Sequence, residues 1–266
     1  VRSKLFEAKP DLVINAAAYN NVDAAESEGR DLCYLLNRDA PGYIAEAVKE
    51  LSKMNGKDTR KGVNQNDALT GVCPTFVQYS TDYVFGGANP NGYGEDDPTD
   101  PISEYGRSKA EGEKRIQEIY DQVYIIRPSR IFGQMGSGEG VKESFVDLML
   151  RLSQDRDQFD MVDEELTSPT YAPDLAKRTR EIVENYPPGI YHGTNEGACT
   201  WYGFAEEIFK QIGRTDIKLN KVGSDHYPRP AKRPACSWLL NTKLPPARSW
   251  QEALAEYLKE NKKIRN

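Results

Sequence analysis

The sequence predicts an α/β fold built on a parallel sheet with helices on both faces. Short apolar segments of strand length alternate with longer segments whose apolar residues recur at helical spacing. The strand-like segments are apolar on both sides, which is typical of parallel strands covered by helices on both faces. With 266 residues, 38% of them hydrophobic, the chain can bury a core of one large or two modest domains.

Four strands and six helices are expected. The strands are expected at 13–18, 75–85, 123–132 and 189–194. The helices are expected at 32–51, 104–120, 142–152, 174–185, 201–212 and 249–260.

The first half of the chain gives the clearer elements. The segment 13–18 (VINAAA) is a short apolar run, and 32–51 carries an apolar stripe at helical spacing. The polar segment 52–72 is expected to be a surface excursion between the first helix and the second strand. Ser103 is the expected N-cap of the helix that follows the second strand. Beyond Gly133 the pattern loosens, so helical periodicity and one short apolar run define the remaining elements.

Charge and cysteine content exclude several classes of protein. The chain has 35 Lys and Arg against 41 Asp and Glu, a net charge of −6, so a general nucleic-acid or anionic-membrane binder is not expected. The four cysteines lie far apart, and there are only two histidines, so neither a metal site nor a disulfide framework is predicted. No apolar run is long enough for a membrane span. A reducing cytoplasm is the expected compartment.

Tyr105 and Lys109 form the sharpest local pattern. Positions i and i+4 share one face of a helix, so the phenol and the ammonium are expected to face one cleft. A nearby ammonium stabilises the phenolate and is expected to lower the pKa of Tyr105 toward neutrality. The spacing alone is common, and a solvated helix face is the alternative interpretation of it.

The residues at the strand ends strengthen this pattern. Thr81 follows a buried strand, and ligands of open α/β sheets bind beyond the carboxyl ends of the strands. The small residues of 15–18 end the neighbouring strand and leave room for a flat ring to approach. These segments are therefore expected to meet the Tyr105 helix at one cleft.

The motifs, taken in order, resemble the extended short-chain dehydrogenase/reductases, and most closely the dTDP-4-dehydrorhamnose reductases. The resembling segments are 10–18 (PDLVINAAA), 22–26 (VDAAE), 79–85 (YSTDYVF), 105–109 (YGRSK), 127–129 (RPS), 168–172 (SPTYA), 189–192 (GIYH) and 233–234 (RP). Together they extend over nearly the whole chain. The segments TDYVF and SPTYA are far rarer than Tyr-x-x-x-Lys and make the resemblance specific.

The resemblance implies an α/β fold in which a doubly wound parallel sheet is joined to a smaller α/β domain. The larger part is a Rossmann-like NAD(P)-binding domain of 1–133 plus 172–198, and the smaller part is a nucleotide-sugar substrate domain of 134–171 plus 199–266. The implied cofactor is NADPH, with NADH as the alternative, and a homodimer is a possible assembly. Asn37 matches a structural asparagine of the family.

The resemblance also implies the reaction and its residues. Hydride passes from the cofactor to the C4 ketone of a nucleotide-linked 4-keto-6-deoxyhexose, Tyr105 protonates the alkoxide, Lys109 holds the ribose hydroxyls, and Thr81 binds the carbonyl oxygen. The implied cofactor contacts are Asn15, Ala16, Ala17, Ser80, Tyr105, Lys109, Arg127 and Pro128. The implied substrate contacts are Asn20, Asp82, Arg130 and Arg233, the last for the diphosphate.

The sequence departs from the family pattern at three places. No strand and glycine-rich turn for the pyrophosphate precede Pro10. About 60 residues of the native protein are therefore expected to be missing from the start of this sequence, which leaves the parallel sheet incomplete; a natural fragment unable to hold NADPH tightly is the alternative. Arg130 stands where the family usually has a tryptophan, and Asn20 where it often has a threonine. These two departures predict a different 4-keto sugar or a site that has drifted.

Three alternatives stay open at this level. A dehydratase would carry a glutamate where Tyr83 follows Thr81 and Asp82, which counts against dehydration. An epimerase shares the tyrosine and the lysine and is not separated by sequence. A non-catalytic binding subunit, similar to the regulatory subunit of methionine adenosyltransferase, could use the same fold to bind a partner enzyme.

Overall fold

The core of the fold is a four-stranded parallel sheet. The structure is a computed structural model that describes residues 1–54, 74–136 and 143–265. The strands are β1 (Leu12–Asn15), β2 (Thr75–Tyr79), β3 (Val123–Arg127) and β7 (Gly189–His192). They lie in the order β1-β2-β3-β7, and each pairs in parallel with its neighbour. The predicted α/β class and parallel pairing are therefore confirmed.

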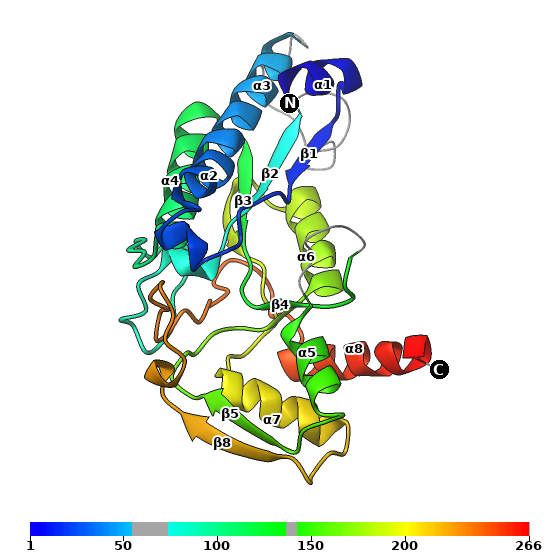
Figure 1. The fold of residues 1–266 in the computed structure, drawn as a ribbon. Helices are drawn as coiled ribbons and strands as arrows, with labels where there is room; N and C mark the ends of the chain where they lie inside the picture. Colours follow the sequence, from blue (N-terminus) through cyan, green and yellow to red (C-terminus); the bar gives the residue numbers. More distant parts are fainter. Residues whose placement is uncertain (55–73, 137–142, 266) are drawn as a thin grey trace.

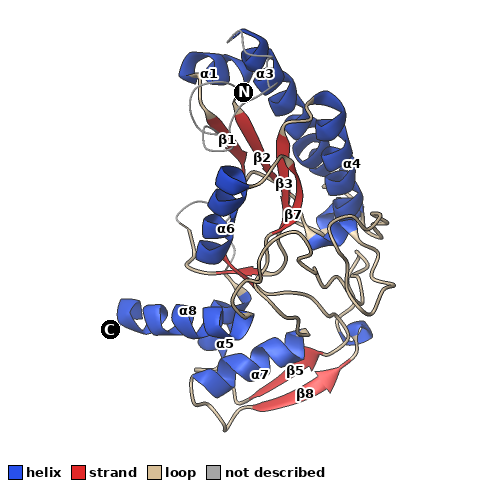
Figure 2. Cartoon of the chain, turned by 180° about the vertical axis from the view of Figure 1, so that it is seen from behind, coloured by secondary structure: helices blue, strands red, loops and turns tan. Residues whose placement is uncertain are grey.

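Helices cover both faces of this sheet (Figures 1 and 2). Successive strand residues point to opposite faces, so Phe76 packs with α3 (Ala40–Met54) and α4 (Glu104–Ile119), and Val77 packs with α6 (Ala172–Asn185). Both strand residues are fully buried. This burial on two sides explains why the strands are continuously apolar.

All four expected strands end earlier in the structure than in the prediction, and for two of them the break matters for the site. The strand expected over 75–85 ends at Tyr79, because Thr81 caps a 3-10 turn over Asp82–Val84 with its side chain. The strand expected over 123–132 ends at Arg127 and resumes as β4 (Ile131–Phe132), which pairs with β6 (Thr170–Tyr171) in another sheet. Both breaks lie at the carboxyl edge of the main sheet.

The first long helical segment is continuous but irregular. It comprises α2 (Arg30–Tyr34), a π turn over Leu35–Asp39 and α3. Pro41 has no N–H to donate to the Asn37 carbonyl, which accounts for the irregular turn. The Asn37 side chain holds the loop after β1, since it bonds both the N–H and the carbonyl of Tyr19.

A second group of elements lies below the sheet in Figure 1. It contains α5 (Phe145–Leu152), β5 (Gln158–Val162), α7 (Trp201–Gln211), β8 (Lys218–Val222) and α8 (Trp250–Arg265). β5 and β8 pair in parallel, and α5, α7 and α8 share one apolar core. The expected helices are confirmed here, whereas β5, β8 and the N-terminal α1 (Arg2–Ala8) were not predicted.

The division into two domains at the predicted boundaries stays a prediction. Most of the expected excursion at 52–72 falls outside the described residues. Within the described part of the chain, none of the helices has the length and apolar character needed to cross a membrane.

Candidate active site

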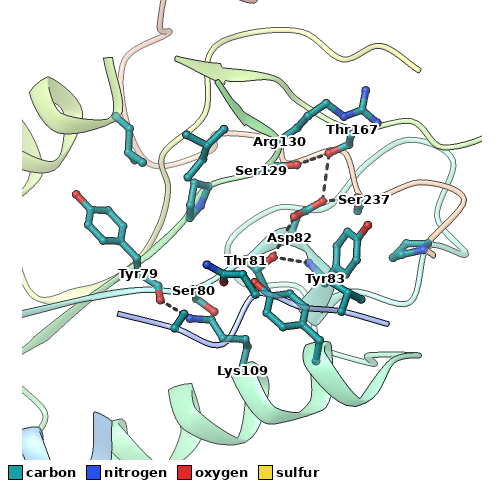
Figure 3. A pocket seen from close by; sticks show the side chains of 18 of the residues that line it. Tyr79, Ser80, Thr81, Asp82, Tyr83, Lys109, Ser129, Arg130, Thr167 and Ser237 are labelled. Atoms are coloured by element: carbon teal, nitrogen blue, oxygen red, sulfur yellow. Dashed lines mark hydrogen bonds between the residues drawn. The ribbon is translucent and has the colours of Figure 1, made fainter. Parts of the chain in front are cut away.

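A cavity of about 690 Å³ lies at the carboxyl ends of β1, β2 and β3 (Figure 3). This volume is within the range of small-molecule sites, roughly 300–1,000 Å³. Ala16, Thr81 and Pro128 line it from the strand ends, and Tyr105 and Lys109 line it from α4. The second group of elements and the segments next to it contribute Glu165, Thr167, Trp201 and Ser237.

The start of α4 fixes Tyr105 and Lys109. The Ser103 hydroxyl accepts a hydrogen bond from the Gly106 N–H at 3.1 Å and caps the helix as the sequence predicts. Tyr105 is 9% exposed and Lys109 is 4% exposed. The Lys109 Nζ donates to the carbonyl of Tyr79 at 2.6 Å. The phenol and the ammonium therefore reach the same cavity from one helix face.

The protonation of these two groups differs from the expectation. Burial raises the pKa of Tyr105, and its hydrogen bond with Thr81 lowers it only in part. Burial also lowers the pKa of Lys109 to about 8. The predicted lowering of the Tyr105 pKa by Lys109 is wrong for this structure, because desolvation dominates and the ammonium is directed at the Tyr79 carbonyl. At neutral pH the phenol is protonated and Lys109 is charged.

Asp82 is the centre of a buried group of hydroxyls (Figure 3). Its carboxylate accepts from Thr81 at 3.1 Å, from Thr167 at 3.2 Å and from Ser237 at 2.5 Å. Burial raises the pKa of Asp82, and these hydroxyls lower it. Asp82 lines the cavity, as predicted for a substrate contact, but its carboxylate oxygens are occupied by protein donors. Its visible role is to hold Thr81 and to join distant segments.

Ser80 and two alanines form a wall with room for a ligand. The Ser80 Oγ is buried, and no partner for it occurs within the part of the chain that the structure describes. A buried hydroxyl without a partner is unfavourable unless a ligand binds it. Ala16 and Ala18 line the cavity beside Ser80 and present only methyl groups.

The other residues predicted near the first strand are divided between the cavity and the sheet. Asn20 is exposed and lines the cavity. Asn15 does not line it, because its Nδ2 donates to Gln78 Oε1 at 2.8 Å across the β1–β2 pair. Ala17 is exposed and also does not line the cavity. The predictions for Asn15 and Ala17 as direct cofactor contacts therefore find no support in the shape of the cavity.

Arg127 lies away from the cavity, so its contact with the cofactor stays a prediction without support from the shape of the cavity. It was predicted to contact the cofactor, but it is 2% exposed, does not line the cavity and forms a bidentate ion pair with Glu113 on α4, at 3.0 and 2.6 Å. Strand alternation places its side chain on the α4 face, together with Ile125. The guanidinium also lies 5.1 Å from the centre of the Phe85 ring. Pro128, the next residue, lines the cavity.

Arg233 also lies away from the cavity, so its contact with the diphosphate stays a prediction. It was predicted to bind the substrate diphosphate, but its Nη2 lies 2.9 Å from Asp23 Oδ2 and its Nη1 donates to the Ala231 carbonyl at 3.0 Å. It does not line the cavity. Asp23 has a lowered pKa, to which the hydrogen bond and charge of Arg233 contribute against the effect of burial. Arg233 therefore joins the segment around Ala231 to Asp23 in the loop after β1, and its guanidinium does not line the cavity.

Arg130 does line the cavity, in contact with an unpredicted neighbour. Its guanidinium lies 3.7 Å from the centre of the Trp201 ring. Trp201 also lines the cavity and donates through Nε1 to Glu165 at 2.9 Å. Thr167 and Ser237 were missed as cavity residues, although both lie in or beside segments that carry the resemblance.

Known proteins match this chain over most of its length. The family described as RmlD substrate binding domain matches residues 1–54 and 66–263. The spore coat polysaccharide biosynthesis protein SpsK of Bacillus subtilis is 36% identical over 264 residues, which are 98% of this chain and 83% of that protein. A dTDP-4-dehydrorhamnose reductase of Streptomyces griseus is 34% identical over 267 residues, 96% of this chain and 79% of that enzyme.

A solved structure agrees in fold. The crystal structure of dTDP-4-dehydrorhamnose reductase from Bacillus anthracis in complex with NADP is 30% identical to this chain and superposes with a TM-score of 0.82. The match covers 97% of this chain and 84% of that structure. From the matched family and the extent of these similarities, this chain belongs to the RmlD substrate binding domain family.

Proposed function

We propose that this chain is an NADPH-dependent oxidoreductase that reduces the C4 ketone of a nucleotide-linked 4-keto-6-deoxyhexose, as a dTDP-4-dehydrorhamnose reductase does. The observation that carries the proposal is the meeting of Thr81, Tyr105 and Lys109 on the wall of one cavity. The names of the Streptomyces griseus and Bacillus anthracis relatives, and the NADP of the latter's structure, support the same reaction.

The residues at the β2 end fit a nicotinamide cofactor. The buried Ser80 hydroxyl has no hydrogen-bond partner among the described residues, and Ala16 and Ala18 leave space for a flat ring. Lys109 supplies a buried charge for ribose hydroxyls. When bound there, NADPH supplies the hydride. Lys109 holds the ribose with donors that point away from the Tyr79 carbonyl, since its ammonium has three N–H groups.

Tyr105 acts as the proton donor. Its raised pKa keeps the phenol protonated at neutral pH, which is the form needed to neutralise an alkoxide. A buried phenol also meets less competing water than an exposed one. The high pKa that contradicts the sequence expectation therefore suits reduction, in which the enzyme gives a proton at each turnover.

Thr81 orients the ketone oxygen. In the structure its hydroxyl donates to Asp82 at 3.1 Å and accepts from the Tyr83 N–H at 3.3 Å. The bond to Asp82 is long for two oxygens, so the hydroxyl proton turns readily from Asp82 to a ketone oxygen beside Tyr105. Asp82 keeps hydrogen bonds from Thr167 and Ser237 after this turn.

The geometry favours reduction over dehydration. Asp82, the residue that would act as an acid in a dehydratase, has its carboxylate oxygens bound by hydroxyls. The next residue is Tyr83, whose pKa is raised by burial, so it does not act as a base. A dehydratase site would need a carboxylate there.

The test is oxidation of NADPH by the native full-length protein in the presence of a dTDP-linked 4-keto-6-deoxyhexose. Tyr105→Phe is expected to lower kcat at least about 100-fold, because the proton donor is lost while the ring remains. Tyr191→Phe is the matched control: this buried tyrosine donates to the Pro187 carbonyl at 2.6 Å and lies outside the cavity. It is expected to keep full activity.

Product analysis separates the alternatives. A 4-hydroxy product with one NADPH oxidised per sugar supports the reductase. A sugar that changes configuration without net oxidation of NADPH would show an epimerase instead. NADPH binding without turnover in the wild-type protein would support the non-catalytic binding subunit and overturn the proposal.

A further inference from the structure

The cations around the cavity are not equivalent. Arg229 pairs with Glu165, and Arg233 pairs with Asp23, so both are neutralised by carboxylates. Lys109 is committed to the Tyr79 carbonyl and, under the proposed function, to the cofactor. Arg130 lines the cavity and forms no ion pair with any carboxylate among the described residues. It is therefore the cation on the substrate side whose charge the protein leaves unpaired.

The Arg130 guanidinium is nonetheless held in place. Its Nη1 donates to the Cys199 carbonyl at 3.1 Å and its Nη2 to the Glu165 carbonyl at 3.2 Å. Its plane lies over Trp201, with 3.7 Å between the guanidinium carbon and the ring centre. The two carbonyls and the ring fix the position of the charge but do not neutralise it.

One donor of Arg130 is left without a partner. The Nε is buried and makes no hydrogen bond to any described residue. Burial lowers the pKa of Arg130, while the nearby charges of Asp82 and Glu165, which form no ion pair with it, act in the opposite direction. An anion in the cavity would supply the paired counter-charge that the guanidinium lacks among the described residues.

The backbone at Arg130 is also unusual. Its φ is 40°, and Lys9 is the only other described non-glycine residue with a positive φ. Such conformations are unfavourable for residues with a side chain and persist where the surrounding structure imposes them, often at ligand sites. Here the turn between β3 and β4 directs residue 130 toward the cavity instead of along a strand.

We infer that Arg130, held over Trp201, is the residue that binds the diphosphate of the nucleotide-sugar substrate, in place of Arg233. The inference rests on the proposed function for the identity of the substrate. The planar fork of an arginine matches phosphate oxygens in two-point contacts. A carboxylate would satisfy the same chemistry, but a 4-keto-6-deoxyhexose has none, so the diphosphate is the anion that the substrate offers.

Binding of dTDP and of thymidine to the full-length protein tests this, because the two probes differ only in the diphosphate. Arg130→Met is expected to weaken dTDP binding about 10- to 100-fold and to leave thymidine binding within about twofold of the wild type. Arg130→Lys keeps the charge but loses the fork, so an intermediate loss is expected. Arg180→Met, which removes an exposed arginine paired with Glu184, is the control.

The outcomes decide the proposal. Equal dTDP affinities for wild type and Arg130→Met overturn it, and a loss of dTDP affinity in Arg233→Met but not in Arg130→Met returns the diphosphate to Arg233. If Arg130→Met also loses thymidine binding through misfolding, Arg130→Lys decides: wild-type dTDP affinity in that variant overturns the proposal. Arg130-dependent dTDP binding without NADPH oxidation would leave this site standing while the reductase proposal fails.

Discussion

Lys109 combines catalysis with a cost in stability. Its ammonium is 4% exposed and lies near no carboxylate at ion-pair distance among the described residues, while one backbone carbonyl accepts from it. Burial lowers its pKa from 10.5 to about 8. Keeping the charge at neutral pH therefore costs on the order of 3 kcal/mol of folding free energy.

Lys109→Met is expected to raise the free energy of unfolding by about 1–3 kcal/mol at pH 7 while abolishing NADPH oxidation. The Tyr79 carbonyl keeps a hydrogen bond from Gln78 Nε2 at 2.7 Å, so the substitution leaves no bare acceptor. Urea unfolding at several pH values measures the effect. Because the folded pKa is the lower one, the unfolded chain binds more protons between pH 8 and 10.5, and the wild type gains stability over that range.

The pH series also contains its control. The difference in the free energy of unfolding between Lys109→Met and the wild type should be largest below pH 8 and should decrease toward pH 10, since the variant lacks the titrating group. A difference in the free energy of unfolding that stays constant over this range would mean that it does not come from the Lys109 charge.

Arg127 is the opposite case, since its buried charge forms a bidentate ion pair with Glu113. Arg127→Met leaves Glu113, whose side chain is 5% exposed, without its counter-charge. Loss of about 3–5 kcal/mol in the free energy of unfolding is expected. The KM for NADPH should stay unchanged in the folded fraction, because Arg127 does not line the cavity. A selective rise in that KM with unchanged stability would restore Arg127 as a cofactor residue.

At the scale of elements, α4 positions the catalytic pair by a close approach to its neighbours. A Cβ at Gly112 would lie 2.2 Å from the Asn37 carbonyl oxygen, and one at Gly106 would lie 2.2 Å from that of Tyr83. Both obstacles are backbone atoms and cannot turn aside. The two glycines therefore let α4 pack directly on the π turn and on the 3-10 turn after β2.

Gly112→Ala is expected to lower the free energy of unfolding by about 1–3 kcal/mol, since the methyl group forces α4 away from the Asn37 backbone. Gly203→Ala on α7 is the matched control. Its Cβ would meet Cys199 Cβ at 3.5 Å, an ordinary contact, so a gain of up to about 1 kcal/mol is expected from the lower entropy of the unfolded chain. Denaturant unfolding compares the two, and equal effects would contradict the packing argument.

Elements with strong local features were predictable and weak ones were not. The sequence identifies α4 by its cap Ser103 and by its apolar spacing, and the structure gives nearly the same bounds. β8 (KLNKV) carries two lysines and an asparagine and is only partly buried, so it lacks the apolar pattern of a strand. Its pairing with β5, 60 residues earlier at Asp160 and Asn220, is a tertiary property.

For the whole molecule, the cavity depends on contacts between distant segments. The Asp82 carboxylate accepts hydrogen bonds from the hydroxyls of Thr167 and Ser237, which are 85 and 155 positions away in the chain. The Ser237 backbone N–H also bonds the Leu166 carbonyl at 2.8 Å. Through these bonds the group that holds Thr81 is tied to the segments that close the substrate side of the cavity.

The sequence by itself determined the parallel α/β fold, the family resemblance and the convergence of Thr81, Tyr105 and Lys109. These follow from local periodicity, from a cap, and from the rule that parallel strands end at one edge. Only the tertiary structure decided which cations face a ligand. Arg233 is neutralised by Asp23, 210 positions away, Arg127 by Glu113 across a strand face, and Arg130 by no carboxylate that the structure describes. Ion pairing and desolvation depend on distance in space, which spacing along the chain does not encode.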